Sequence, residues 1–278
     1  MAPLTLTVHG IYQLKTQIGE GSFAQVWTGY NLSTGENIAA KIELPPEYEP
    51  ITPVPMLPYE AQVYRMIHGH TGFPSVRWSG ADCEAHVLIL DKLGATIEQF
   101  RCICRGRLSR KTVLMVAIQA LDRIEFAHSR GVIIRDIFTH VVYLIDLGLA
   151  KLYQDAYTGK HMSFREGRGF VGPRRFASYN MHFGSEQSRR DDLEMLGNVL
   201  LYLFHGRLPW QRIYAPDYDA KLIRIGEMKV GKTFQELLER SPAEFRKYFD
   251  HCRRLSFEEK PDYAFLNTIF HEACQGGG

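Results

Sequence analysis

The chain has 278 residues, of which 45% are hydrophobic and 23% are charged. These proportions are close to the globular average and exclude an intrinsically disordered or collagen-like chain. The 33 basic and 31 acidic residues leave a net charge of only +2. The surface as a whole therefore does not attract nucleic acid or membranes, and any preference for anions must be local.

The N-terminal residues MAPLTLTVHG lack the basic start and the long apolar stretch of a signal peptide. No apolar run approaches the roughly 20 residues that span a bilayer. We therefore expect a cytoplasmic or nuclear protein without a membrane span. Five cysteines, two of them in a lone Cys-x-Cys at Cys102 and Cys104, do not make the paired pattern of a zinc site.

The first ninety residues read as a sheet with one helix. From residue 11 to about residue 41 the pattern is strand-like, with β-formers in IYQLKTQI, VWTGY and NIAAKIEL, separated by a Gly-rich turn and by NLSTGEN. Six prolines between residues 45 and 58 exclude a helix there and predict an exposed loop. Helical spacing over 59–67 and the segments PSVRWSG and HVLILD then predict one helix and two more strands.

The rest of the chain is predicted to be mostly helical. A long helix follows Ser109, a candidate N-cap, and ends at Gly131. The segment DDLEMLGNVLLYLFHG predicts a second core helix that ends at Gly206, and FQELLER and PAEFRKYFDHC predict further helices. A small β-rich lobe thus precedes a larger α-rich lobe.

Several residues between and after these strands have the chemistry of a phosphate site. Gly19 and Gly21 in IGEGSFAQV would let backbone amides approach a phosphate, although paired glycines in a hairpin also serve simple turns. Lys41 on a strand and Glu60 on the next helix could hold phosphate together, or form only a surface ion pair. Asp136 and Asp146 follow short apolar strands, where a carboxylate is costly unless it is paired or metal-bound.

In this order, the pieces resemble a protein kinase. The resemblance is closest to the casein kinase I family, because LPYEAQVYRMI, TGFPSVRW, RRFASYNMHFGSEQSRRDDLEMLG, LPWQ and CRRLSFEEKPDY are similar to its characteristic stretches. It extends from about residue 11 to about residue 270. It implies one α+β domain of the bilobal kinase fold: a small lobe (about 11–93) with a five-stranded antiparallel sheet and one helix, and a larger, mainly helical lobe (about 94–270).

The resemblance also implies the site. ATP would lie between the lobes, with Leu90 as gatekeeper, Val26 and Ala39 against the adenine, and Asp91 to Gly94 as the hinge. The residues implied in ATP binding are Gly19, Glu20, Gly21, Ser22, Val26, Ala39, Lys41, Glu60, Leu90, Asp91 and Leu93.

Four residues would take part in the chemistry itself. Lys41, positioned by Glu60, would contact the α- and β-phosphates, and Asp146 would hold Mg²⁺. Asp136 would orient the substrate hydroxyl as the catalytic residue. Asp192 looks like the family residue that supports the catalytic-loop backbone.

The chain departs from the family around this catalytic loop. Ile134 replaces the histidine of His-Arg-Asp, Phe138 stands where the family has a lysine, and Val141 stands where it has a metal-binding asparagine. Asp146 follows Asp136 by only ten positions, about half the family's spacing, so we expect most of a catalytic loop and one strand to be missing.

Three readings of this gap stay open: a serine/threonine kinase with impaired transfer, an inactive pseudokinase that binds ATP or acts as a scaffold, and a chain that lacks a coding segment of an active kinase. Transcript sequencing across the gap would decide the third. Ala24 in place of the third loop glycine and Leu147 in place of phenylalanine are milder changes.

The family favours substrates with acidic or already phosphorylated serine or threonine contexts. Arg175 and Lys221 resemble its anion site, with Arg212 as a further contributor, and we expect Asp217 and Asp219 to weaken the local field. The alternative is that each cation is simply solvated. The expected partners are therefore protein substrates and no nucleic acid, and the expected state is a monomer.

Overall fold

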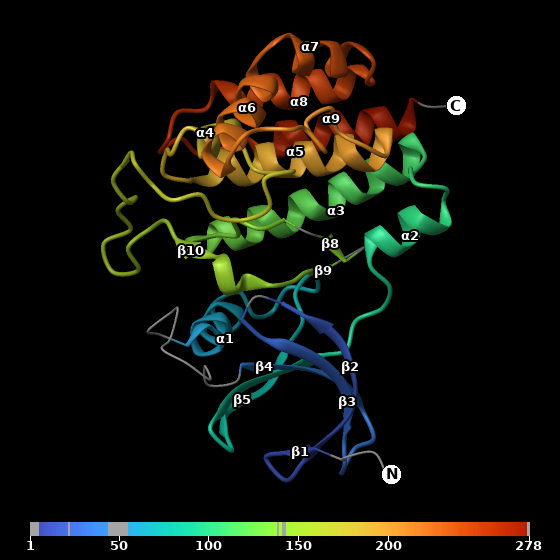
Figure 1. Cartoon of the computed structure of the whole chain (residues 1–278), viewed down its shortest axis with the longest axis vertical. Helices are drawn as coiled ribbons and strands as arrows, with labels where there is room; N and C mark the ends of the chain where they lie inside the picture. Colours follow the sequence, from blue (N-terminus) through green and yellow to red (C-terminus); the bar gives the residue numbers. More distant parts are fainter. Residues whose placement is uncertain (1–5, 22, 44–54, 138, 141–142, 277–278) are drawn as a thin grey trace. The chain divides into compact units, whose positions relative to one another are not determined.

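The computed structural model describes residues 6–21, 23–43, 55–137, 139–140 and 143–276. They form two compact units, one of Met1–Gly94 with Asp146–Gly148 and one of Ala95–Ile145 with Leu149–Gly278. The first unit contains an antiparallel sheet and the second contains most of the helices (Figure 1). The predicted combination of a small antiparallel β-sheet region and a larger helical region is confirmed.

The sheet of the first unit has the strand order β1-β2-β3-β4-β6-β5. Its strands are β1 (Thr7–Val8), β2 (Tyr12–Glu20), β3 (Gln25–Asn31), β4 (Asn37–Glu43), β5 (Val76–Asp82) and β6 (Ala85–Asp91). Five of them correspond to the predicted strands. The sixth, β1, was not predicted, because two residues are too short to show a hydrophobic period; it pairs through Thr7↔Gln13 and Val8↔Tyr12.

The two faces of this sheet have different chemistry because successive side chains in a strand point to opposite sides. On β4, Ile38, Ala40 and Ile42 are buried in a core with Val87 and Ile89 of β6. The residues between them in β4 belong to the opposite face. One face of the sheet therefore packs into this core, and the other face presents a different set of side chains.

Helix α1 (Met56–Met66) begins earlier than predicted. We expected Pro58 to exclude a helix, but it lies in the first turn, where the N–H that proline lacks would have no partner within the helix. The amides of Met56 and Leu57, which have no partner within the helix, donate to the Glu43 carboxylate at 3.0 and 2.9 Å. A strand residue thus caps the helix, and the predicted loop between them lies largely outside the described residues, at 44–54.

The helices of the second unit confirm the predicted start and stop signals. Ser109 caps α3 by accepting the amide of Thr112 at 3.2 Å, and α5 ends at Gly206 with a φ of 80°. In Figure 1, α3 lies along α5 and α9, against which it packs. The described helices are α2 (Ile97–Ile103), α3 (Arg110–Ser129), α4 (Tyr179–His182), α5 (Arg189–His205), α6 (Tyr218–Val230), α7 (Lys232–Glu239), α8 (Ala243–Arg254) and α9 (Tyr263–Gln275).

The expected loss of a strand near the catalytic loop is wrong. Strands β8 (Thr139–His140) and β9 (Tyr143–Leu144) form a short hairpin, and β7 (Val132–Ile133) pairs with β10 (Lys151–Leu152). Two-residue strands are invisible to sequence periodicity. Phe138 and Val141 lie outside the described residues. Within the part of the chain that is described, no helix is long and apolar enough to cross a membrane.

Candidate active site

The glycine loop lies at the turn between β2 and β3. Gly21 donates its amide to the carbonyl of Ala24 at 2.9 Å, and Gly19 pairs with Val26. A Cβ added to Gly19 or Gly21 would lie 3.8 or 3.6 Å from its nearest described neighbour, which is ordinary contact. Since neither glycine is forced by crowding or by a positive φ, the turn itself does not need them. A ligand that approaches the backbone closely would need them.

The side chains implied around the adenine share one face of the sheet. Val26 pairs with Lys41, and Ala39 pairs with Leu90. Directly paired residues of an antiparallel sheet point to the same side, and Ala39 and Lys41 are two positions apart on β4. These four residues therefore lie on the face opposite the Ile38–Ala40–Ile42 core. Glu20 is exposed at the end of β2, and Ser22 lies outside the described residues.

Lys41, Glu60 and Asp146 form a connected cluster in the first unit. The Nζ of Lys41 lies 2.7 Å from Oε1 of Glu60 and 2.8 Å from Oδ1 of Asp146. The side chains of Lys41 and Glu60 are 14% and 3% exposed, whereas that of Asp146 is 67% exposed. The ammonium is thus held from the buried side by one carboxylate, and the other carboxylate faces solvent. A surface ion pair is excluded for Lys41 and Glu60.

The protonation of the cluster reflects both burial and charge. Burial alone would lower the pKa of Lys41, but the carboxylates of Glu60 and Asp146 outweigh it and raise the pKa above its usual value. Burial raises the pKa of Glu60, against the opposing effect of the Lys41 ammonium. Lys41 therefore remains a cation at neutral pH, as a phosphate-binding lysine must.

The backbone at Asp146 is held by residues of α1. The amide of Asp146 donates to the hydroxyl of Tyr64 at 3.1 Å, and the amide of Leu147 donates to Oε1 of Glu60 at 3.2 Å. Asp146 has a φ of 66°, a left-handed conformation that is uncommon outside glycine and often marks functional positions. The sequence did not indicate Tyr64, because a tyrosine on the buried face of a helix reads as a core residue. Leu147 is buried, as expected for an apolar replacement of phenylalanine.

The predicted hinge begins at the end of β6. The side chain of Asp91 accepts the amide of Ser75 at 2.9 Å and pairs with Arg77, and its own amide donates to the carbonyl of Ser75 at 3.2 Å. The amide of Asp91 is therefore already used, and a hinge hydrogen bond to adenine would have to come from another backbone group. Leu93 is half-buried two residues later.

Asp136 belongs to the second unit, where Asp192 supports the preceding backbone. The carboxylate of Asp192 accepts the amides of Ile134 at 2.6 Å and Arg135 at 2.8 Å, which confirms the expected contact. Arg135 has a φ of 65°, so this turn is held in an unusual conformation immediately before Asp136. His128 of α3, which the sequence did not indicate, also contacts Asp192, at 2.9 Å.

Asp146 provides a suitable ligand for a divalent metal ion. Magnesium typically takes one or two carboxylates from the protein and fills its shell with water and substrate phosphates. The exposed carboxylate of Asp146 meets this requirement. Over the described ranges of the chain, no group of three or more histidine, cysteine, aspartate or glutamate residues could hold a metal without such outside ligands. The donor set therefore fits a cation that arrives with phosphate.

The three residues of the predicted anion site line one cavity of the second unit. Arg175, Lys221 and Arg212 share a cavity of about 1160 Å³. Other basic residues line it too: Arg101, Arg174, Arg207 and Arg240.

The acidic residues of this cavity are not the ones we expected. Among the described residues that line it, Glu98 and Glu236 are acidic, and Asp217 and Asp219 are not present. Asp217 instead caps α6 by accepting the amide of Ala220 at 2.7 Å. Asp217 and Asp219 therefore do not line the cavity, and their expected weakening of the local field stays a prediction.

Arg175 is oriented by aromatic rings in this cavity. Its guanidinium lies 5.2 Å from the ring centre of Tyr202 and 5.5 Å from that of Phe176. Arg101 lies 4.8 Å from the same Tyr202 ring and is paired with Glu98. Glu98 thus already has a cationic partner, which also lowers its pKa.

A comparison with protein-family models gives a match over most of the chain. The matching family is described as the protein kinase domain, and the match covers residues 12–259. It includes the glycine loop, the Lys41–Glu60–Asp146 cluster, Asp136 and the basic cavity.

Proposed function

The chain belongs to the protein kinase domain family, and from this membership we propose that it is a serine/threonine protein kinase of the casein kinase I type. Membership implies a transferase that uses ATP and a divalent metal ion. We further propose that the metal is Mg²⁺, that the two units are the two lobes of a single kinase domain, and that the substrates are proteins with acidic or phosphorylated sequences around the acceptor.

The observation that carries this proposal is the Lys41–Glu60–Asp146 cluster. Phosphoryl transfer depends mainly on positioned charge, and this cluster has a buried anchor, a held ammonium and an exposed carboxylate. Lys41 would donate to the α- and β-phosphates while Glu60 holds it in place. Asp146 would hold the metal, which neutralises phosphate charge when bound. Asp136 would orient the substrate hydroxyl on a turn that Asp192 fixes.

Transfer should be slow in this chain. Phe138 and Val141 replace a lysine and an asparagine that would stabilise charge, and removal of one such donor typically costs about 3 kcal/mol. Two losses approach ~10⁴-fold, although such effects do not simply add. From a typical kinase rate of roughly 1–100 s⁻¹, about one turnover per minutes to hours would remain.

The second candidate function is an ATP-binding protein without transfer. The same two replacements favour it, because they remove transfer chemistry and leave Lys41, Glu60 and Asp146 in place. If the coding sequence lacks a segment between Asp136 and Asp146, the longer product would be an ordinary active kinase.

The test is phosphate transfer from radiolabelled ATP to casein, measured beside Asp146→Asn. The proposal predicts slow transfer by the unaltered chain and a rate at least tenfold lower for the variant. Equal rates for the two proteins would assign any signal to contamination and leave the ATP-binding candidate in place.

A further inference from the structure

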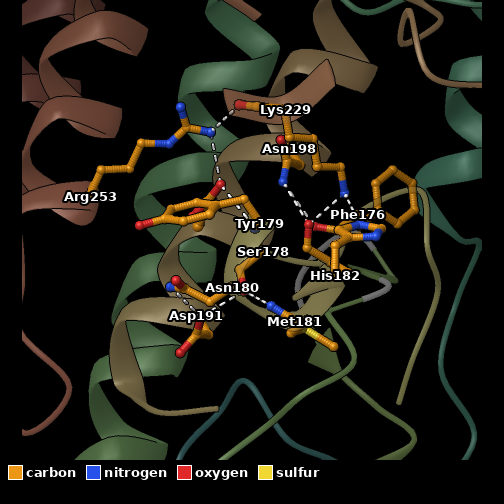
Figure 2. Close-up of polar contacts among 12 residues, drawn as sticks. Phe176, Ser178, Tyr179, Asn180, Met181, His182, Asp191, Asn198, Lys229 and Arg253 are labelled. Atoms are coloured by element: carbon orange, nitrogen blue, oxygen red, sulfur yellow. Dashed lines mark hydrogen bonds and ion pairs between the residues drawn. The ribbon is translucent and has the colours of Figure 1, made fainter. Parts of the chain in front are cut away.

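Three buried side chains donate hydrogen bonds to the backbone segment that contains Arg174 and Arg175. Lys229 donates to the carbonyls of Arg174 at 3.0 Å and Ala177 at 2.6 Å. The indole of Trp210 donates to the carbonyl of Arg175 at 2.8 Å. Asn198 donates to the carbonyls of Phe176 and Ala177, at 3.0 and 3.2 Å (Figure 2). Four successive carbonyls, 174–177, each therefore receive a buried side-chain donor. We call these three side chains the carbonyl clamp.

Lys229 is the fully buried amine of the clamp, and burial lowers its pKa to about 7 from a usual 10.5. Its third contact is Nε2 of His182, at 3.1 Å. Nδ1 of His182 faces the carbonyl of Leu222 at 3.0 Å, and a carbonyl can only accept, so Nδ1 carries the proton and Nε2 accepts. In its protonated form, the three donors of this amine thus meet three acceptors.

The sequence pattern of α6 places Lys229 on the buried face of this helix. Leu222, Ile225, Gly226 and Lys229 are the buried residues of α6 and share one helical stripe. A Cβ on Gly226 would lie only 2.8 Å from Cβ of His182, so α6 and α4 approach closely here. The close approach brings Lys229 to the loop. An apolar residue would fill the stripe without the cost of burying an ammonium.

Two charged residues, Arg253 and Glu194, also hold the backbone of Lys229 in place. Arg253 donates to the carbonyl of Lys229 at 2.8 Å and to Glu194 at 2.9 Å (Figure 2). The ring of Trp210 lies 5.2 Å from Nζ of Lys229, which connects two members of the clamp. Lys229 is therefore bound to α8 directly, to α5 through Arg253, and to the 174–177 backbone.

What the clamp supports is the rim of the basic cavity. Arg174 and Arg175 both line it, and their guanidinium groups rest on Tyr218 at 4.7 Å and Tyr202 at 5.2 Å. Fixed guanidinium groups bind an anion with less loss of conformational freedom than mobile ones. We propose that Lys229, together with Trp210 and Asn198, is a positioning residue that holds Arg174 and Arg175 for a phosphorylated substrate. This inference rests on the proposed use of acidic or phosphorylated substrates and on the predicted anion site in this cavity.

The test compares affinities for one probe, an acidic peptide that contains phosphoserine, by isothermal titration calorimetry on the full chain. Lys229→Met keeps the length of the side chain and removes its donors. We expect about a tenfold loss of affinity, the equivalent of about one hydrogen bond. Trp210→Phe, which keeps an aromatic ring and removes the donor to Arg175, should give a smaller loss of the same kind. Lys247→Met is the matched control, because Lys247 is exposed and does not line the cavity.

A double-mutant cycle separates positioning from a merely structural role. If Lys229 acts through Arg175, Lys229→Met should lower affinity by less than about twofold when Arg175→Ala is already present. Equal losses with and without Arg175→Ala would overturn the inference. If Lys229→Met does not fold, Trp210→Phe in the same cycle decides the question by the same criterion. Unchanged affinity in Arg175→Ala would overturn the inference and the anion site together, while ATP binding by the same proteins tests the kinase assignment separately.

Discussion

Glu60 is buried beside an ammonium that also contacts a solvent-facing carboxylate. A buried ion pair adds little net stability, because replacing it by apolar residues of similar volume is often neutral or stabilising. The pair is therefore better explained by a ligand that uses Lys41 than by stability alone. Glu60 has a second task, because it accepts the amide of Leu147 at 3.2 Å.

Glu60→Gln should weaken ATP binding by about tenfold and lower the free energy of unfolding by about 1–3 kcal/mol. The amide can still accept from Leu147, but it no longer balances the charge of Lys41. Calorimetric titration with ATP and denaturant unfolding measure the two effects. Glu36→Gln, an exposed change in the turn between β3 and β4, is the control. Equal ATP affinity in Glu60→Gln and the unaltered chain would contradict this role.

His182 should make the protein sensitive to acid. Burial, followed by the charge of Lys229, lowers its pKa to about 3 from a usual 6.5. Between these two values the unfolded chain binds a proton that the folded chain does not, so stability present above pH 6.5 is lost as the pH falls toward 3. Each pKa unit is worth about 1.4 kcal/mol, so the loss reaches several kcal/mol.

The measurement is the free energy of unfolding from pH 7 to pH 4 for the unaltered chain and for His182→Gln. The glutamine does not titrate in this range, so its curve should be flatter. Parallel curves would show that His182 is not held neutral in the folded protein.

Residues on short, chemically explicit patterns could be predicted from the sequence. Lys41, Glu60 and Asp146 could be identified because they follow one another in a recognisable order: a lysine on a strand, a glutamate on the next helix and an aspartate after a short apolar strand. The structure brings them together. Lys229 could not be assigned, because a lysine on a helix is usually solvated and its acceptors lie 47 to 55 positions away. The sequence did contain one sign that Lys229 is buried, because it shares a helical stripe with Leu222 and Ile225.

At the scale of elements, long and periodic segments were predictable and short ones were not. The caps of α3 and α5 follow from Ser109 and Gly206 alone. Strands β1, β8 and β9 have two residues each, and their pairing depends on partners that no local pattern names. The start of α1 was missed for a related reason, since its cap, Glu43, comes from a strand.

Gly226→Ala tests the close contact of α4 and α6. Alanine favours a helix over glycine by about 1 kcal/mol, yet its Cβ would lie 2.8 Å from His182 Cβ and 3.1 Å from Phe183 Cζ. Overpacking of this kind costs about 1–3 kcal/mol, so we expect a net loss of stability. Gly169→Ala, which has open space around it, should stay within about 0.5 kcal/mol of the unaltered chain. A stabilised Gly226→Ala would contradict the packing.

At the scale of the molecule, the residues for the two tasks of a kinase are divided between the units. The first unit holds the Lys41–Glu60–Asp146 cluster, and the second holds Asp136 and the basic cavity. Losses in the catalytic loop therefore need not disturb nucleotide binding or anion binding. A chain that keeps both and transfers phosphate slowly is the expected outcome.

The measurement that tests this account most directly is unfolding of the full chain in ATP, with and without Mg²⁺, beside Lys41→Met. Ligand at a hundredfold excess over its Kd stabilises a protein by about 2.7 kcal/mol. We predict a shift of this size for the unaltered chain, larger with Mg²⁺ than without it, and little or no shift for Lys41→Met. No shift in millimolar ATP and Mg²⁺, or the same shift in both proteins, would contradict the assignment of this cluster as the nucleotide site.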